Sequence, residues 1–213
     1  FMKGAIETAD KVTTVSPTYA AEILDPWFSH GLDGLLRQKE YKLCGILNGI
    51  DVDVYNPATD PDIAKNFDAS SFEDGKAACK AALQDELGLN RDGSPALAMV
   101  TRLVGHKGVD LVRSIADGLL QQGIELVMLG SGEAGYEAFF NELAARNPGR
   151  VGVYIGFNAK LAQHIYAGAD IFLMPSRSEP CGLAQMVSCR YGTIPVVRET
   201  GGLKDSIHDS GDG

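Results

Sequence analysis

The stretch ALAMVTRLVGHKGVDLVRSIADGLLQQGIELVMLG, residues 96–130, decides the fold class. It begins and ends with apolar runs, at 96–100 and 124–130, that have the length of buried strands. Between them, residues 108–122 predict an amphipathic helix, which would connect the two strands in a parallel β-α-β unit. The expected buried face of this helix has spacings of three and four residues: Val109, Val112, Ile115, Ala116 and Leu119.

The same alternation continues as far as residue 199. The runs that begin at 124, 170 and 193 are apolar throughout, which is typical of strands covered on both faces. Five strands joined by right-handed helical crossovers predict an α/β fold with a doubly wound, Rossmann-like parallel sheet in the order 3-2-1-4-5. The further helices are expected at 135–146, 159–168 and 182–192, and the further strands at 151–156, 170–175 and 193–199.

The first 95 residues follow a different pattern. Residues 3–25 predict a helix, the strand KVTTVS, and a second helix with Ser16 as its cap and Pro17 in its first position. No partner for this strand is evident, and a single strand cannot bury itself, so we expect the chain to start inside a domain. Residues 26–95 are rich in turns and close with a helix at about 75–87, which we expect to be solvated.

The composition is that of a globular protein, with 45% hydrophobic and 22% charged residues among 213. Neither a signal peptide nor a run of ~20 apolar residues is present. The net charge of -9 disfavours nucleic-acid binding, although it does not exclude a small anionic ligand. Cys44, Cys79, Cys181 and Cys189 form no CxxC pair and have no histidine at ligand spacing, so we expect reduced thiols and no metal site.

Two loops at the expected reversal of strand order carry the candidate functional residues. Ligands of open α/β sheets bind at this point, beyond the carboxyl ends of the strands. The loop at 101–108 offers Arg102 and Lys107, and the loop at 175–182 offers Glu179; each precedes a helix. Two cations and two helix N-termini favour a diphosphate, with Glu179 reaching hydroxyl groups beyond it. Solvated loop cations are the alternative for Arg102 and Lys107.

The motifs of other common α/β enzymes are absent from the sequence. GxGxxG does not follow the first strand of the sheet, and GSGEAG at 130–135 is better explained as a turn, with phosphate contact as a minor alternative. There is no GxxxxGK[ST] and no GxSxG. Cys181 has no paired histidine, which argues against a thiolate nucleophile.

Six separated motifs carry a resemblance to a known family. They are ADKVTTVSPTYAAEI, GILNGIDVDVYNPATD, TRLVGHKGVDLV, VMLGSG, DIFLMPSRSEPCGLAQ and YGTIPVVRETGGLKDS. With them the chain resembles bacterial glycogen synthases and plant starch synthases, which are retaining glycosyltransferases of the GT-B fold with two Rossmann-like domains. Such enzymes transfer glucose from ADP-glucose to the non-reducing end of an α-1,4-glucan.

The resemblance implies that the chain is a piece of such an enzyme, because the family's N-terminal K-x-G-G-L motif is missing. Residues 1–45 would be the tail of the N-terminal, acceptor-side domain. Residues 46–213 would be the linker and most of the nucleotide-sugar-binding C-terminal domain. We expect the chain alone to bind ADP weakly and to synthesise no glucan.

The resemblance also implies roles for individual residues. Arg102 and Lys107 correspond to cations that neutralise the donor diphosphate, and Glu179 to a glutamate that holds the donor glucose by its hydroxyls. Phe157 stands where the family commonly has a tyrosine against the adenine. The other implied donor-binding residues are Asn48, Cys181, Gly182, Leu183, Thr200, Gly201 and Gly202. Alternative structural roles are a helix cap for Asn48, a core position for Phe157 and plain turns for the glycines.

Three positions depart from patterns of this family or its wider group. Ser178 replaces an aromatic residue beside Glu179 and Ala184 replaces a threonine, which puts full activity in doubt. Val187 stands where the wider E-x7-E pattern has its second acid, an absence that glycogen and starch synthases share. This last departure favours the subgroup.

The expected mechanism is a front-face one, in which the leaving phosphate deprotonates the acceptor; a nucleophilic carboxylate is the alternative. No metal is expected, because two cations and two helix dipoles already meet the diphosphate, and no cofactor is expected either. The expected partners are ADP-glucose and an α-1,4-glucan, not nucleic acid or a membrane, in the bacterial cytoplasm or else the plastid stroma. Two other functions stay open: a GT-B enzyme with another nucleotide or acceptor, and a non-catalytic nucleotide-binding module.

Overall fold

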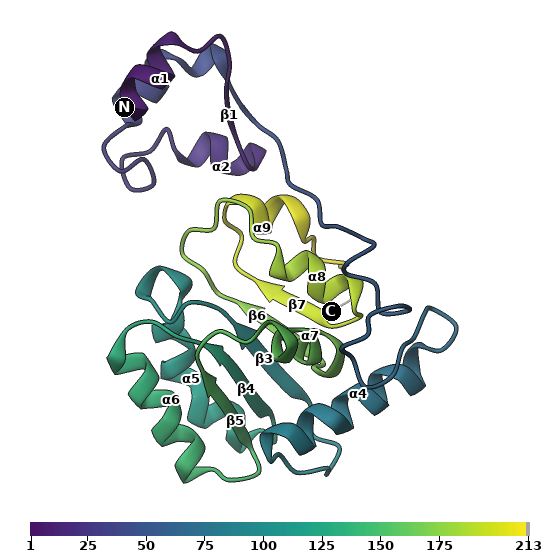
Figure 1. The fold of residues 1–213 in the computed structure, drawn as a ribbon. Coiled ribbons are helices and arrows are strands. Elements are labelled where there is room, and N and C mark those ends of the chain that lie inside the picture. The colour runs from purple at the N-terminus through teal and green to yellow at the C-terminus, as the bar shows by residue number, and fades with distance from the viewer. Residues whose placement is uncertain (212–213) are drawn as a thin grey trace. The chain divides into compact units, whose positions relative to one another are not determined.

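The computed structural model describes residues 1–211, in which two compact units can be distinguished (Figure 1). The first unit contains residues 1–49, 176–183 and the segment from 197 onward, and the second contains residues 50–175 and 184–196. Both units therefore combine segments that are distant in the sequence. The domain boundary expected between residues 45 and 46 stays a prediction.

The second unit is built on a five-stranded sheet. Its strands lie in the order β5-β4-β3-β6-β7, and the pairs β3–β4, β4–β5 and β3–β6 are parallel. This confirms the predicted order 3-2-1-4-5, with its reversal between the first and fourth strands. The strands are β3 (Ala96–Val100), β4 (Glu125–Gly130), β5 (Val151–Ile155), β6 (Ile171–Met174) and β7 (Ile194–Val197).

The strands differ in how well they are covered. β4 is buried at every position, as its apolar run predicts. The same prediction is wrong for β7, where Ile194 is 67% and Val196 is 50% exposed. The physical reason is that β7 lies at the edge of the sheet.

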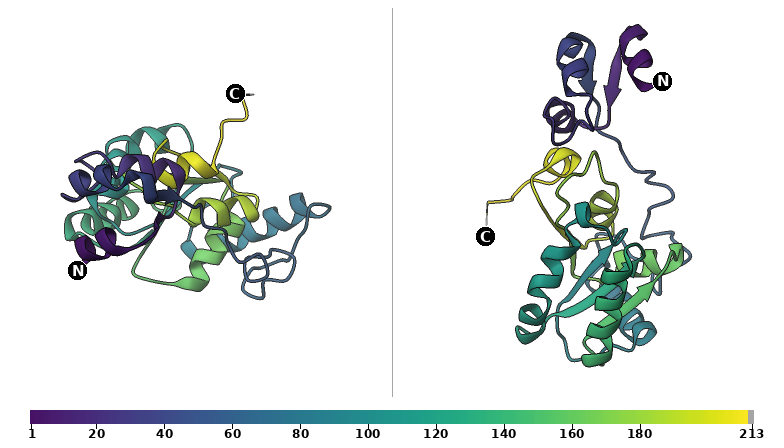
Figure 2. Two further views of the ribbon diagram at one scale, coloured as in Figure 1. Left: turned by 90° about the horizontal axis from the view of Figure 1, so that it is seen from above. Right: turned by 90° about the vertical axis from the view of Figure 1, so that its left-hand side faces the viewer.

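Helices α5 (Val109–Gln121) and α6 (Ala134–Arg146) cover one face of this sheet (Figure 2). Val112 of α5 and Phe140 of α6 belong to one apolar cluster with residues of β3 and β4. The predicted buried face of α5 is confirmed except at Ile115, which is 49% exposed because it lies at the margin of that face.

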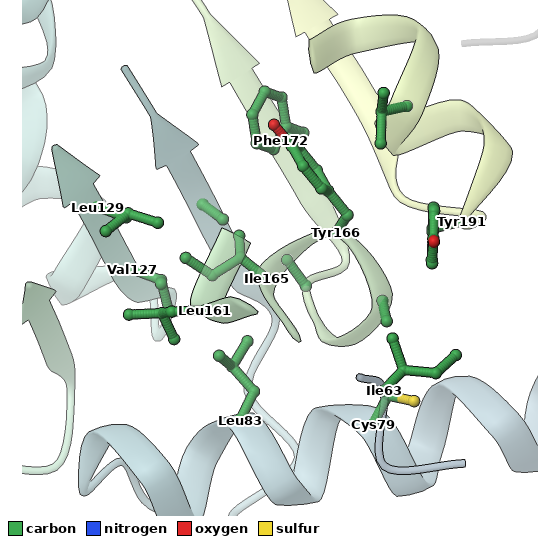
Figure 3. Packing of buried hydrophobic residues seen from close by; sticks show 14 of the residues in the cluster. Ile63, Cys79, Leu83, Val127, Leu129, Leu161, Ile165, Tyr166, Phe172 and Tyr191 are labelled. Atoms are coloured by element: carbon green, nitrogen blue, oxygen red, sulfur yellow. The ribbon is translucent and has the colours of Figure 1, made fainter. Parts of the chain in front are cut away.

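Helices α4 (Phe72–Leu87), α7 (Ala159–Gly168) and α8 (Ala184–Arg190) cover the opposite face. Figure 3 shows part of this second apolar cluster, which includes Leu83 of α4 and Ile165 of α7. The expectation that the helix near 75–87 is solvated is wrong, since Leu83 is 1% exposed.

Polar side chains of α4 fix the starts of several strands. Lys76, Lys80 and Gln84 lie one turn apart and reach successive strands across the sheet. Burial lowers the pKa of Lys76 to about 8. Their bonds are from Lys76 Nζ to Ala169 O and Thr193 Oγ1 (both 2.6 Å), from Lys80 Nζ to Asp170 Oδ2 (2.6 Å) and from Gln84 Nε2 to Glu125 Oε2 (2.9 Å).

Replacing Glu125 with glutamine is expected to raise the free energy of unfolding at pH 7 by about 1 kcal/mol, because it removes a buried charge. Glu125 is 0% exposed, its Oε1 has no partner among residues 1–211, and burial raises the pKa of its carboxyl. Because the pKa of Glu125 is raised in the folded state, the protonated carboxyl is the form that the fold tolerates. The stability that it contributes is fully present below the ordinary pKa and is lost as the pH rises through the folded pKa.

The gain from Glu125→Gln should therefore shrink as the pH falls from 7 towards 4.5, the ordinary pKa of the group. Urea unfolding followed by circular dichroism at both pH values measures this difference. Glu142→Gln, at an exposed position of α6, should change stability at neither pH. A Glu125→Gln chain that is equally less stable at both values contradicts the prediction.

The first unit contains a two-stranded parallel sheet, in which β1 (Val12–Thr14) pairs with β2 (Leu43–Gly45). The expectation that the first strand lacks a partner in this chain is therefore wrong. The predicted helix start is confirmed: Ser16 Oγ accepts from Tyr19 N at 2.8 Å, and Pro17 is the first residue of α2. The helices of this unit are α1 (Met2–Thr8), α2 (Pro17–Glu22), α3 (Asp33–Gln38), the 3-10 turn η1 (Glu40–Lys42) and α9 (Gly201–Ser206).

Candidate active site

A pocket of about 230 Å³ opens at the carboxyl ends of β3, β4 and β5. Each strand contributes its last residues and the start of the following loop, and Ala162 of α7 completes the wall. Open α/β sheets bind their ligands at this edge. The other lining residues are Val100, Thr101, Arg102, Leu129, Gly130, Ser131, Gly156, Phe157 and Asn158.

Gly130 allows two of the strand ends that line the pocket to approach closely, because it carries no side chain. A Cβ on Gly130 would lie 1.8 Å from Thr101 O, so the end of β4 approaches the loop after β3 backbone against backbone. Thr101 N donates to Leu129 O at 3.0 Å across the same junction. Asn158 closes the wall as the cap of α7, where its Oδ1 accepts from Leu161 N at 3.0 Å.

Gly130→Ala is expected to destabilise the chain by about 3 kcal/mol, because the new methyl group would collide with backbone atoms that must move. The shift of Thr101 would also displace one wall of the pocket. The matched control is Gly135→Ala on α6, where a Cβ has no atom within 4 Å and should be neutral or slightly stabilising. Thermal unfolding of both variants checks this, and equal stability of the two would contradict it.

Arg102 and Phe157 are the predicted site residues that line this pocket. Phe157 is 92% exposed, so the alternative of a core position for it is wrong. An exposed ring beside an apolar pocket offers a stacking surface for a flat heterocycle, and the Arg102 guanidinium offers charge and planar donors for a phosphate.

The loops after β3 and β4 are joined by hydrogen bonds. Leu103 N donates to Ser131 O at 2.9 Å, Glu133 N donates to Leu103 O at 2.8 Å, and Gly105 N reaches Glu133 Oε1 at 3.3 Å. Sequence reasoning favoured a turn for Gly130 and Ser131, with phosphate contact as a minor alternative, and did not predict the pocket that they line. The sequence feature that could have indicated the pocket was a glycine at the carboxyl end of a strand that is apolar almost throughout.

Lys107 ends a 3-10 turn, η2 (Gly105–Lys107), directly ahead of α5, and it is not among the residues lining the pocket. Gly108 follows with φ 72°, in the left-handed region, and a Cβ on it would lie 2.3 Å from Pro175 O. This close approach keeps the start of α5 beside the end of β6, at the predicted reversal of strand order.

The remaining predicted site residues belong to the first unit. The structure brings most of them together: Gly202 N donates to Glu179 O at 3.0 Å, and a Cβ on Gly202 would lie 2.3 Å from Cys181 Cα. Glu179 is 7% exposed, and its Oε2 accepts from Ser176 Oγ at 3.0 Å. The loop thus holds a buried carboxylate in a fixed place. Thr200 and Gly201 are buried in the same turn as Gly202.

Three more predicted residues lie in this unit. Gly182 has φ 72°, which only glycine adopts easily, and Leu183 is 48% exposed. Asn48 is exposed in a segment without helix, so the alternative of a helix cap is wrong.

Within residues 1–211, no group of three or more His, Cys, Asp or Glu side chains is arranged to hold a metal ion. No helix in this part of the chain combines the length and the apolar character that crossing a membrane requires. None of the four cysteines, all of which lie in the described part of the chain, forms a disulfide.

Residues 84–213 match the family described as Glycosyl transferases group 1, and residues 1–38 match the Starch synthase catalytic domain. A glycogen synthase of Clostridium perfringens (strain 13 / Type A) is 54% identical over 98% of this chain and 43% of its own length. A glycogen synthase of Bacillus cereus (strain B4264) is 51% identical over 98% of this chain and 44% of its own. The chain thus spans less than half the length of these curated relatives, and its predicted resemblance to their family is confirmed.

Solved structures confirm the predicted GT-B fold. The catalytic domain of starch synthase IV from Arabidopsis thaliana, bound to ADP and acarbose, is 41% identical, with a TM-score of 0.93 over 99% of this chain and 44% of that one. Anabaena HepE in complex with UDP and glucose has a TM-score of 0.63 at 19% identity, over 96% of this chain and 48% of that one. This second likeness shows the fold alone.

Proposed function

Because the chain belongs to the family of group 1 glycosyl transferases, we propose that it supplies the donor-binding part of a glycogen or starch synthase. Such an enzyme transfers glucose from ADP-glucose to the non-reducing end of an α-1,4-glucan with retention. The observation that carries the proposal is the likeness to starch synthase IV, which was solved with ADP and acarbose and matches 99% of this chain. The glycogen synthases at 51–54% identity support the same donor and acceptor.

In this proposal the pocket in the second unit receives the nucleotide. The adenine stacks on Phe157, which lacks the hydroxyl of a tyrosine but keeps the ring face. Arg102 and Lys107 neutralise the diphosphate. Glu179 binds the glucose hydroxyls, and the other donor contacts come from Asn48, Cys181, Gly182, Leu183, Thr200, Gly201 and Gly202.

The proposed reaction uses the leaving group as the base. The bond from glucose C1 to the diphosphate oxygen breaks, the bond from C1 to the acceptor hydroxyl oxygen forms on the same face, and the hydroxyl proton passes to the released phosphate. The role of Arg102 and Lys107 is electrostatic stabilisation of the departing ADP, for which no metal or cofactor is required. The proposed compartment is the bacterial cytoplasm.

Transfer assays on the full-length protein that carries this sequence test the function. We expect incorporation of labelled glucose from ADP-glucose into glycogen, insensitive to chelators, and much slower incorporation from UDP-glucose. Preference for UDP-glucose would indicate another GT-B transferase, and ADP binding without transfer would indicate a non-catalytic module. The 213-residue chain alone should bind ADP weakly in calorimetry and elongate no glucan.

A further inference from the structure

Glu22, the last residue of α2, holds the turn that begins α9. Its Oε1 accepts from Thr200 Oγ1 at 3.0 Å and from Gly201 N at 2.9 Å. Thr200 is the N-cap of α9, but its side chain makes no capping bond to the helix, and the first turn of α9 has no acidic residue. A carboxylate from another helix therefore supplies the acceptor that an N-cap side chain ordinarily provides.

The turn held by Glu22 packs without any gap on the loop that carries Glu179. Gly202 N donates to Glu179 O, and a Cβ on Gly201 would lie 2.0 Å from the same oxygen. Both glycines are buried. Because the two backbones are in direct contact, a displacement of the turn must displace Glu179 as well.

Folding alone does not account for a glutamate at this position. Glu22 Oε2 is buried and has no hydrogen-bond partner among residues 1–211, which is a cost that the fold bears. A buried polar atom of this kind requires a reason beyond packing. The two donors that Glu22 does bind both belong to the turn against Glu179.

We propose that Glu22 is a positioning residue for Glu179, acting through the turn formed by Thr200, Gly201 and Gly202. The inference rests on the proposed function for what Glu179 binds, and every contact in it lies within one unit. Misplacement of a sugar-binding carboxylate by about 1 Å is enough to reduce turnover up to 100-fold, although the nucleotide contacts stay intact.

The structure offers a matched control in the second contact between α2 and α9. Asp205, in α9, accepts from Thr18 N at 2.9 Å and from Thr18 Oγ1 at 2.5 Å. This carboxylate also accepts hydrogen bonds from α2 and so also joins the two helices, and its bonds to Thr18 do not involve the turn. Asp205→Ala therefore reproduces the general loosening of α2 from α9 and leaves the two bonds between Glu22 and the turn in place.

Steady-state kinetics of the full-length protein provide the first test. Glu22→Ala should lower kcat 10- to 100-fold, with KM for ADP-glucose within about 3-fold of the parent. Glu22→Gln keeps an oxygen acceptor for both donors and should restore kcat to within about 5-fold. Asp205→Ala should leave kcat within about 3-fold. An unchanged kcat in Glu22→Ala, or an equal loss in Asp205→Ala, overturns the proposal.

Amide hydrogen exchange of the 213-residue chain is the second test, and it requires no catalysis. Glu22→Ala should speed exchange at Gly201 and Gly202 at least 10-fold, and Asp205→Ala should not. If the parent enzyme transfers no glucose from ADP-glucose, the proposed function fails, and the exchange data still decide whether Glu22 holds the turn. Unchanged exchange in Glu22→Ala overturns the positioning role whatever the activity.

Discussion

Glu179→Ala in the full-length protein is expected to lower kcat with ADP-glucose by about 100- to 1,000-fold and to leave the affinity for ADP within about 3-fold. In the proposed function this carboxylate binds glucose hydroxyls, and ADP alone has no glucose to offer. Glu179 is buried, and its place is fixed by Ser176 Oγ and by the Gly202 amide. Burial strengthens the electrostatic interactions of its charge in the transition state.

Glu179→Gln separates a sugar clamp from a nucleophile. An amide still accepts hydrogen bonds from hydroxyl groups, so a clamp should retain about 1–10% of the parent kcat, whereas a nucleophile should retain none. The control is Glu40→Ala, an exposed glutamate in the same unit, which should have parental activity. A glycosyl-enzyme adduct trapped on Glu179 and identified by mass spectrometry would falsify the clamp.

Arg102→Ala is expected to weaken ADP binding about 10- to 100-fold and to lower kcat/KM for ADP-glucose by at least 100-fold, because the guanidinium is proposed to neutralise both the bound and the departing diphosphate. Lys107→Ala should act in the same direction. Calorimetry with ADP measures the binding loss in the 213-residue chain, and transfer assays on the full-length protein measure the catalytic loss.

The two kinds of variant should thus differ in a defined way. Replacement of Glu179 should lower turnover alone, whereas replacement of Arg102 should weaken ADP binding as well. Arg146→Ala, an exposed arginine at the end of α6, removes the same charge far along the helix from the pocket and should change neither quantity. Raising the salt concentration should weaken ADP binding less in Arg102→Ala than in the parent. Parental ADP affinity in Arg102→Ala contradicts the assigned role.

The sequence was sufficient to predict the sheet order of the second unit, because strands such as β4 are apolar throughout and the helices between them have a clear period. It was not sufficient for β2, whose three residues carry no period, or for α4, whose buried side is formed partly by the stems of Lys76 and Lys80. Long side chains that hydrogen-bond to a sheet have the same sequence signature as solvated ones.

The candidate site was predictable to a different extent in each part. Arg102 follows from its place after β3, but the exposed Phe157 was found only through a family resemblance, since an aromatic residue in a loop has no pattern of its own. The contact of Glu22 with Gly201 joins residues 179 positions apart, and no local rule could predict it. Gly130 was overlooked because a glycine that allows two backbone segments to approach closely looks the same in the sequence as a glycine in a turn.

Helix α4 lets the two ends of the strands in its sheet vary independently. Lys76, Lys80 and Gln84 fasten the strands from their starting ends, so the loops at the opposite ends bear none of this anchoring. A descendant of this chain could exchange those loops, and with them the ligand proposed to bind there, while the spacing of the strands is inherited unchanged. An insertion of one residue between Lys76 and Lys80 would have the reverse result, since it would turn Lys76 by about 100° relative to Lys80 and Gln84 and leave the loops untouched.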